Sequence, residues 1–287
     1  MLFSSSGKHT IVVEGEADFR LFRQWVLDKN ARIQNVQGKP EVKEVWQIAQ
    51  ARKFKNLSCL VDVDYDVVVG NCPITDNQFI YVSLDGGNSS SEVECNDLES
   101  VLIRSHALLK VMSQKYRGND LYTDFESRVD DLREALRGAA ATIGAFRAAD
   151  QRVLKLRNRS PIGGDFFIDD GFFEAGPVRV NEQKLIDALR RSSRVGAGAM
   201  EEVVDIARQL SLEYSDGWQL CRGHDLSEML ARHVSILIDR NVSRREIEED
   251  LRMACELDTI RATRFGAKLL RIGDSVGKPL LGPHVTQ

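Results

Sequence analysis

Short apolar runs alternate with helical patterns over the first hundred residues, and this alternation constrains the fold more than any other feature. The run at 10–13 is β-branched and apolar, and it is a predicted strand together with the runs at 32–36, 58–61 and 79–82. Helical spacing follows the first two of them, in one set at Leu21, Phe22, Trp25 and Val26 and in another at Val42, Val45, Trp46 and Ala49. Strands separated by helices form βαβ units, so we predict an α/β fold with a mostly parallel sheet flanked by helices.

From about residue 97 the pattern becomes helical, which predicts a large α-helical insertion or a second helical domain. We expect an α/β core at 1–103, basic helices at 104–213, and C-terminal helices at 214–287. The segment Trp218-Gln219-Leu220-Cys221 is interpreted as a strand that returns to the first sheet, and this would make 104–213 an insertion. A stripe of apolar residues in the last segment is interpreted as core or as an interface: Leu226, Met229, Leu230, Val234 and Leu237.

Composition narrows the class of protein. No apolar run in the 287 residues approaches the length of roughly 20 residues that a membrane span needs, so we expect no membrane segment. The first residues lack a basic region followed by an apolar stretch, so no secretory signal is expected. The five cysteines are scattered without a Cys-x-x-Cys pair, which disfavours zinc ribbons and disulfide frameworks. These features favour a cytoplasmic protein.

Charge is unevenly distributed along the chain. Residues 1–103 carry a net charge of −5, whereas residues 104–160 carry +5. An acidic segment beside a basic one suits a protein that holds cations in one place and a polyanion in another. The cations that we expect to follow a phosphate backbone are Arg147, Arg152, Lys155, Arg157 and Arg159. The alternative is that these helices only present solvated faces.

Acidic side chains follow two of the predicted strands. Glu14 closes the first strand and Asp18 lies one helical turn later, while Asp62 and Asp64 close the third. Residues two apart on a strand point to the same face, so Asp62 and Asp64 can address one ion. Clustered carboxylates repel unless a cation compensates them, and Mg²⁺ prefers oxygen ligands. The alternatives are that acids at a helix start interact with its dipole, and that Asp-x-Asp is turn chemistry.

These elements resemble a known family. Ile11-Val12-Val13-Glu14-Gly15-Glu16-Ala17-Asp18, followed by Val61-Asp62-Val63-Asp64, is similar to a Toprim domain over roughly residues 8–103. Topoisomerases, bacterial primases, recombination mediators and overcoming-lysogenization-defect nucleases share this fold. Gly38-Lys39 and Asn96-Asp97-Leu98-Glu99 look like elements of the nuclease branch. Together with the latter, Arg222-Gly223-His224-Asp225-Leu226 resembles stand-alone Toprim effectors of the phage anti-restriction-induced defence system.

The resemblance implies a role for each matching residue. Glu14 would act as a metal ligand or general acid/base, and Asp62 and Asp64 would hold a first Mg²⁺, with Mn²⁺ as the alternative ion. A second ion would be held by three further acids, Asp18, Asp66 and Glu99. Lys39 would neutralise developing charge, and His224 would assist the leaving group. The alternative for His224 is a structural position at a helix start.

The function implied is a Mg²⁺-dependent endonuclease, a toxic effector of anti-phage defence that cleaves RNA (tRNA by resemblance) or DNA. By the same resemblance, a separate ABC/SMC-type ATPase would restrain it. This chain should not itself hydrolyse ATP, because Gly7-Lys8 and Gly277-Lys278 lack the spacing of a P-loop. A homodimer is expected because two-fold pairing is the commonest assembly. The alternative is a non-catalytic Toprim adaptor of the recombination-mediator type.

Two rival chemistries fit the sequence less well. His224-Asp225 lacks the spaced partner histidines of a His-Asp phosphohydrolase. Glu41-Val42-Lys43, which has the form of a restriction-nuclease Glu-x-Lys, falls on a helical pattern.

Overall fold

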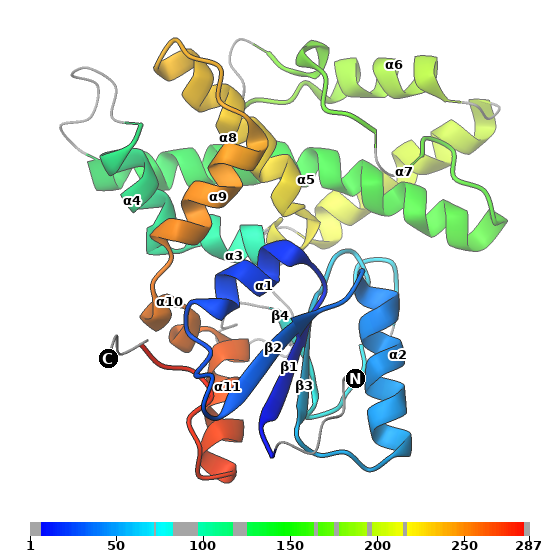
Figure 1. The fold of residues 1–287 in the computed structure, drawn as a ribbon. Helices are drawn as coiled ribbons and strands as arrows, with labels where there is room; N and C mark the ends of the chain where they lie inside the picture. The colour runs from blue at the N-terminus through cyan, green and yellow to red at the C-terminus, as the bar shows by residue number, and fades with distance from the viewer. Residues whose placement is uncertain are drawn as a thin grey trace. The chain divides into compact units, whose positions relative to one another are not determined.

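The computed structural model describes residues 7–71, 73–82, 97–116, 125–163, 166–174, 178–193, 197–214 and 217–283. These residues form two compact units (Figure 1). The sheet unit contains the described residues of 7–63, 73–82 and 255–283. The helical unit contains the described residues of 64–71 and 97–254.

Four parallel strands form the centre of the sheet unit. They are β1 (His9–Val13), β2 (Ala31–Asn35), β3 (Leu57–Asp62) and β4 (Phe79–Val82), in the order β2-β1-β3-β4. Every residue of β1 is buried, as expected of a central strand covered on both faces. The predicted α/β fold with a parallel sheet flanked by helices is therefore confirmed.

Helices cover both faces of this sheet: α1 (Glu16–Arg23), α2 (Lys39–Ala51), α10 (Leu257–Ala262) and α11 (Arg264–Ser275). Figure 1 shows α2 on one side of the sheet and α1 with α11 on the other. Under α2 lies an apolar core made by Val12, Val42, Val45, Ala49, Leu57, Cys59, Val61 and Phe79. On the opposite face, the rings of Phe22 and Phe265 meet edge to face, with their centroids 5.9 Å apart. Burial of these apolar side chains is the main stabilising term for the sheet unit.

The helical unit consists of α3 (Leu98–Arg104), α4 (His106–Gln114), α5 (Phe125–Arg157), α6 (Glu182–Ser192), α7 (Ala197–Glu213), α8 (Gly223–Leu237) and α9 (Arg244–Ala254). Two 3₁₀ turns, η1 (Asp170–Phe172) and η2 (Trp218–Leu220), join them. The long helix α5 packs against α7 and α8. The apolar stripe of α8 is part of this core, since Leu226, Met229, Leu230 and Val234 are all buried. No helix in the described part of the chain is long and apolar enough to cross a membrane.

The strand expected at 218–221 is wrong. Residues Trp218–Leu220 form the 3₁₀ turn η2, which follows Gly217 in the left-handed region at φ 73°. Gly144 of α5 allows this turn to approach, because a Cβ at 144 would lie 1.6 Å from the carbonyl oxygen of Leu220. The chain returns to the sheet unit through helices α10 and α11. The unit boundaries therefore differ from the boundaries near 103 and 213 that we expected.

A buried histidine gives the sheet unit a testable pH dependence. His9 is 4 % exposed, its Nε2 lies 2.9 Å from Ser58 Oγ, and burial lowers its pKa to about 4. An unfolded chain binds a proton at this residue below about pH 6.5, whereas the folded chain stays neutral down to about pH 4. Acidification between these values should therefore destabilise the fold, by up to about 1.4 kcal/mol per pH unit.

Urea unfolding of the wild type and His9→Gln between pH 7 and pH 5 measures this effect. Glutamine cannot take up the proton but can still bond to Ser58, so the variant should lose less stability on acidification. Equal slopes for the two proteins would show that His9 does not titrate between the folded and unfolded states in this range.

Candidate functional site

The carboxyl ends of β1 and β3 bring two acidic residues together in the sheet unit. Glu14 directly follows β1, and Asp62 is the last residue of β3. Glu14 Oε1 accepts a hydrogen bond of 2.7 Å from the backbone N–H of Asp62. Both residues are half-buried. Because adjacent parallel strands end at one edge, residues 48 apart in the chain become neighbours there.

Lys39 lies at the same end of the sheet. Gly38 precedes it with φ 106°, a left-handed value that favours glycine, and α2 begins at Lys39. Lys39 Nζ donates to the carbonyl oxygen of Val63, at 3.2 Å. The ammonium group is therefore held against the main chain between Asp62 and Asp64.

The acids that follow Glu14 have contacts within the start of α1. The backbone N–H of Gly15 donates to Asp18 Oδ2 at 3.2 Å, so Asp18 helps to cap this helix. Glu16 is exposed and pairs with Arg20 at 2.9 Å. For Asp18 these contacts support the interpretation as a helix-start acid, while its expected role as a metal ligand stays a prediction.

Asp64 and Asp66 lie in the stretch 64–71, which follows β3 in the chain and belongs to the helical unit. Asp64 is exposed and has a left-handed backbone with φ 50°. Asp66 Oδ1 accepts a hydrogen bond of 2.9 Å from Asn71 Nδ2, and Asp66 O accepts the N–H of Asn71 at 2.8 Å. Asp66 thus closes a turn with Asn71, while its expected role as a metal ligand stays a prediction.

In the helical unit, the start of α3 contacts the start of α8. Asp97 caps α3 by accepting from Ser100 N at 3.0 Å, and its Oδ2 accepts the N–H of Gly223 at 2.6 Å. A Cβ at position 223 would lie 2.2 Å from Asp97 Oδ1 and 2.4 Å from Glu99 Cβ, so only glycine fits there. Burial, together with the Glu99 charge, raises the pKa of Asp97 to about 7. The two elements that carry the effector resemblance are therefore packed together, although Asn96 lies outside the described residues.

Glu99 and His224 each have a charged partner within the helical unit. Arg252 forms ion pairs with Glu99 and, at 3.7 Å, with Glu248. His224 Nδ1 lies 2.8 Å from Glu248 Oε1, and this hydrogen bond raises the pKa of His224, with burial opposing the rise. These pairs give Glu99 and His224 structural roles, while their expected metal-binding and catalytic roles stay predictions.

Sequence reasoning missed Glu248 and Arg252. The one available signal was their four-residue spacing on a predicted helix, which puts an acid and a base side by side but does not identify Glu99 or His224 as their partners.

The basic residues of α5 are engaged inside the helical unit. Arg147 is 3 % exposed and makes a bidentate pair with Asp225, at 2.8 and 2.9 Å. The expectation that Arg147 follows a phosphate backbone is therefore wrong, because the residue is buried. Arg157 pairs with Glu202 at 2.6 Å.

The donor atoms at the carboxyl end of the sheet fit a hard divalent cation. Glu14 and Asp62 offer only oxygen ligands, and Mg²⁺ is commonly held by one or two carboxylates with water and substrate completing its shell. Across the described ranges, no three His, Cys, Asp or Glu side chains are grouped closely enough to hold a metal ion. Two carboxylates are part of a Mg²⁺ shell, and water and a substrate would have to supply the other oxygen ligands.

Comparisons with known proteins add no family assignment. No family model matches the chain, and no curated protein matches it significantly.

Proposed function

We propose that this protein is a Mg²⁺-dependent, Toprim-like endonuclease. The observation that carries the proposal is the contact between Glu14 and Asp62 at the carboxyl end of a parallel sheet. Ligand sites of open parallel sheets lie at this end. Asp64 follows two residues later and completes the Asp-x-Asp of the Toprim resemblance.

In this proposal, Glu14, Asp62 and Asp64 hold the ion. When bound, Mg²⁺ would supply positive charge that stabilises the negative charge developing on a phosphodiester. The bond from Asp62 N–H fixes the direction of the Glu14 carboxylate, so its orientation does not have to be established on binding. Lys39, held at Val63 O, supplies a second positive charge close to Asp62.

The substrate class and partners rest on the resemblance. We propose RNA, with tRNA as the preferred form, and DNA as the alternative substrate. The role is that of a toxic effector in anti-phage defence, restrained by a separate ABC/SMC-type ATPase and active as a homodimer. The competing proposal, a non-catalytic adaptor, predicts binding to a partner without cleavage.

A cleavage assay with labelled tRNA and duplex DNA tests the proposal. We expect wild-type cleavage to require Mg²⁺ and to stop when the ion is chelated. Asp62→Asn should reduce it by more than the roughly 10- to 100-fold loss typical of outer-shell substitutions, because a direct ligand is changed. The matched control is Asp28→Asn, an exposed acid of the same unit that pairs with Arg23. Cleavage by Asp62→Asn at the wild-type rate would refute the site, and a wild type inactive on both substrates would favour the adaptor.

A further inference from the structure

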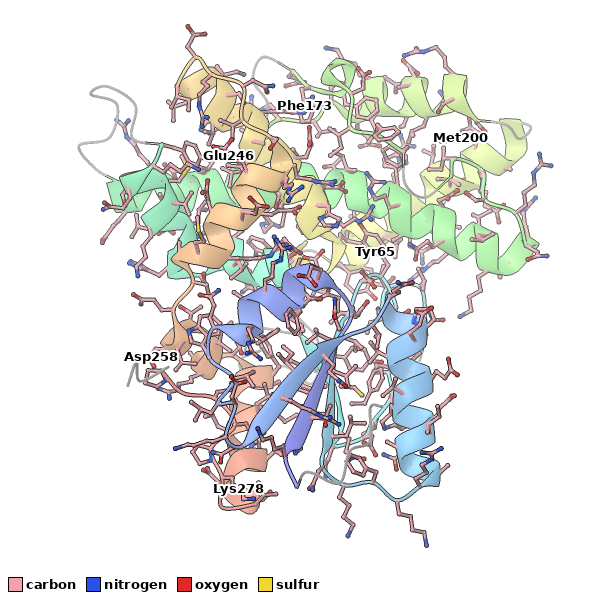
Figure 2. All side chains as sticks on the ribbon, in the orientation of Figure 1. Tyr65, Phe173, Met200, Glu246, Asp258 and Lys278 are labelled. Atoms are coloured by element: carbon pink, nitrogen blue, oxygen red, sulfur yellow. The ribbon has the colours of Figure 1, made fainter. Side chains whose placement is uncertain are left out.

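The stretch 64–71, which carries Asp64 and Asp66, is anchored to helix α5 and to η2 in the helical unit. Tyr65 (labelled in Figure 2) is 3 % exposed, and its hydroxyl donates to the carbonyl oxygen of Leu220 at 3.3 Å. That carbonyl lies close to α5 because residue 144 is glycine. The first anchor thus follows Asp64 directly in the chain.

Two cations of α5 provide the other anchors. Arg152 donates from Nε to the carbonyl oxygen of Val68 at 2.9 Å, and a second bond comes from its Nη2. Val68 is itself buried, with 1 % exposure. The guanidinium group therefore binds the main chain at the middle of the stretch, which fixes its path and not only one side chain.

Lys155 acts on Asp66 through an intermediate residue. Its Nζ donates to Asn71 Oδ1 at 2.9 Å, and Asn71 Nδ2 in turn donates to Asp66 Oδ1 at 2.9 Å. The lysine thereby fixes the orientation of the Asn71 amide, because its ammonium group can only donate and must face the amide oxygen. The amide NH₂ is then directed to the carboxylate of Asp66.

We propose that Arg152 and Lys155 are positioning residues that fix the conformation of the segment 64–71 within the helical unit, and with it the placement of the carboxylates of Asp64 and Asp66 as ligands of a divalent ion. This inference rests on the proposed function. It gives these two cations of α5 a different role from the phosphate contacts that the charge pattern suggested. Arg152 binds Val68 O and pairs with Glu213 at 3.8 Å, and Lys155 binds Asn71 Oδ1. Residues that orient metal ligands typically change metal affinity or activity by about 10- to 100-fold when replaced.

The two roles predict different measurements. We compare Arg152→Gln and Lys155→Gln with the control Arg157→Gln, which removes another α5 cation whose partner is Glu202. Positioning predicts that the Mg²⁺ concentration for half-maximal cleavage rises about tenfold in the first two variants, with substrate affinity and its salt dependence unchanged. Arg152→Lys, which keeps a donor for Val68 O, should restore most of the wild-type Mg²⁺ requirement. If these cations contact phosphates instead, substrate binding should be weaker in the variants. The slope of log affinity against log salt concentration (the salt slope) should then be reduced by about one per cation removed.

Hydrogen exchange tests the anchoring independently of cleavage. The N–H groups of Val69 and Asn71 donate to Tyr65 O and Asp66 O, both at 2.8 Å. Their exchange should be faster in Arg152→Gln than in Arg157→Gln. Unchanged exchange together with an unchanged Mg²⁺ requirement would overturn the inference, as would a reduced salt slope. A wild type that cleaves no nucleic acid would refute the proposed function instead. In that case, Mg²⁺ affinity measured by direct titration, together with the exchange rates, would still decide whether α5 positions the segment.

Discussion

Glu14→Gln should abolish Mg²⁺-dependent cleavage while leaving the sheet unit folded. Glu14 Oε1 accepts the N–H of Asp62 at 2.7 Å, and the amide oxygen of glutamine can accept the same bond. The substitution therefore preserves the shape and the contact and removes only the negative charge. A neutral amide is a poor ligand for Mg²⁺ and cannot take up a proton, so we expect cleavage to fall by about 1000-fold, at the upper end of single-residue electrostatic effects.

The control for this experiment is Glu16→Gln. Glu16 is also an acid at the start of α1, but it is exposed and its carboxylate is paired with Arg20. The Glu16→Gln variant should cleave at the wild-type rate. The thermal unfolding temperature should be nearly unchanged in both Glu14→Gln and Glu16→Gln. Equal activity of Glu14→Gln and wild type would remove the basis of the nuclease proposal. Glu14→Ala is less informative, because it would also leave the Asp62 N–H without its carboxylate partner.

The four strands were predictable because their signal is local. β1 is mostly β-branched and β4 is wholly apolar, while β2 and β3 mix apolar with polar residues, and helical spacing separates the first three. The same local reasoning failed at Trp218-Gln219-Leu220-Cys221, because a short, mostly apolar run does not distinguish a strand from a turn packed into a core. It also extended the first helix too far, since Trp25 and Val26 are buried but lie beyond its end at Arg23.

The candidate site was predictable only where topology links distant residues. Parallel strands end at one edge, and this rule brought Glu14 to Asp62 across 48 residues. No such rule applies in the helical unit. There Glu99 pairs with Arg252, 153 residues later in the chain, and Arg147 pairs with Asp225, 78 residues later. A charge count showed a basic segment at 104–160, but it did not show that one of its arginines is buried. The acid partners of such residues come from the packing of helices, which the sequence pattern does not specify.

Removing either partner of the buried pair Arg147–Asp225 should strongly destabilise the helical unit. Their side chains are 3 % and 5 % exposed, and the two bonds between them measure 2.8 and 2.9 Å. Arg147 also donates to the carbonyl oxygen of Phe166 at 2.9 Å and lies over its ring. Because a buried charge left without its partner is poorly solvated, Arg147→Met and Asp225→Leu should each lower the free energy of unfolding by about 3–5 kcal/mol.

The double variant distinguishes this cause from simple loss of packing. Arg147→Met combined with Asp225→Leu leaves no unpaired charge between the two positions, so its loss of stability should be clearly smaller than the sum of the two single losses. Arg157→Met is the matched control, because its partner Glu202 and the arginine itself remain partly exposed, and its effect should be about 1 kcal/mol or less. Urea unfolding followed by far-UV circular dichroism measures all four variants. Strictly additive losses, or an Arg147→Met effect no larger than that of Arg157→Met, would show that the pair is not an energetically coupled unit.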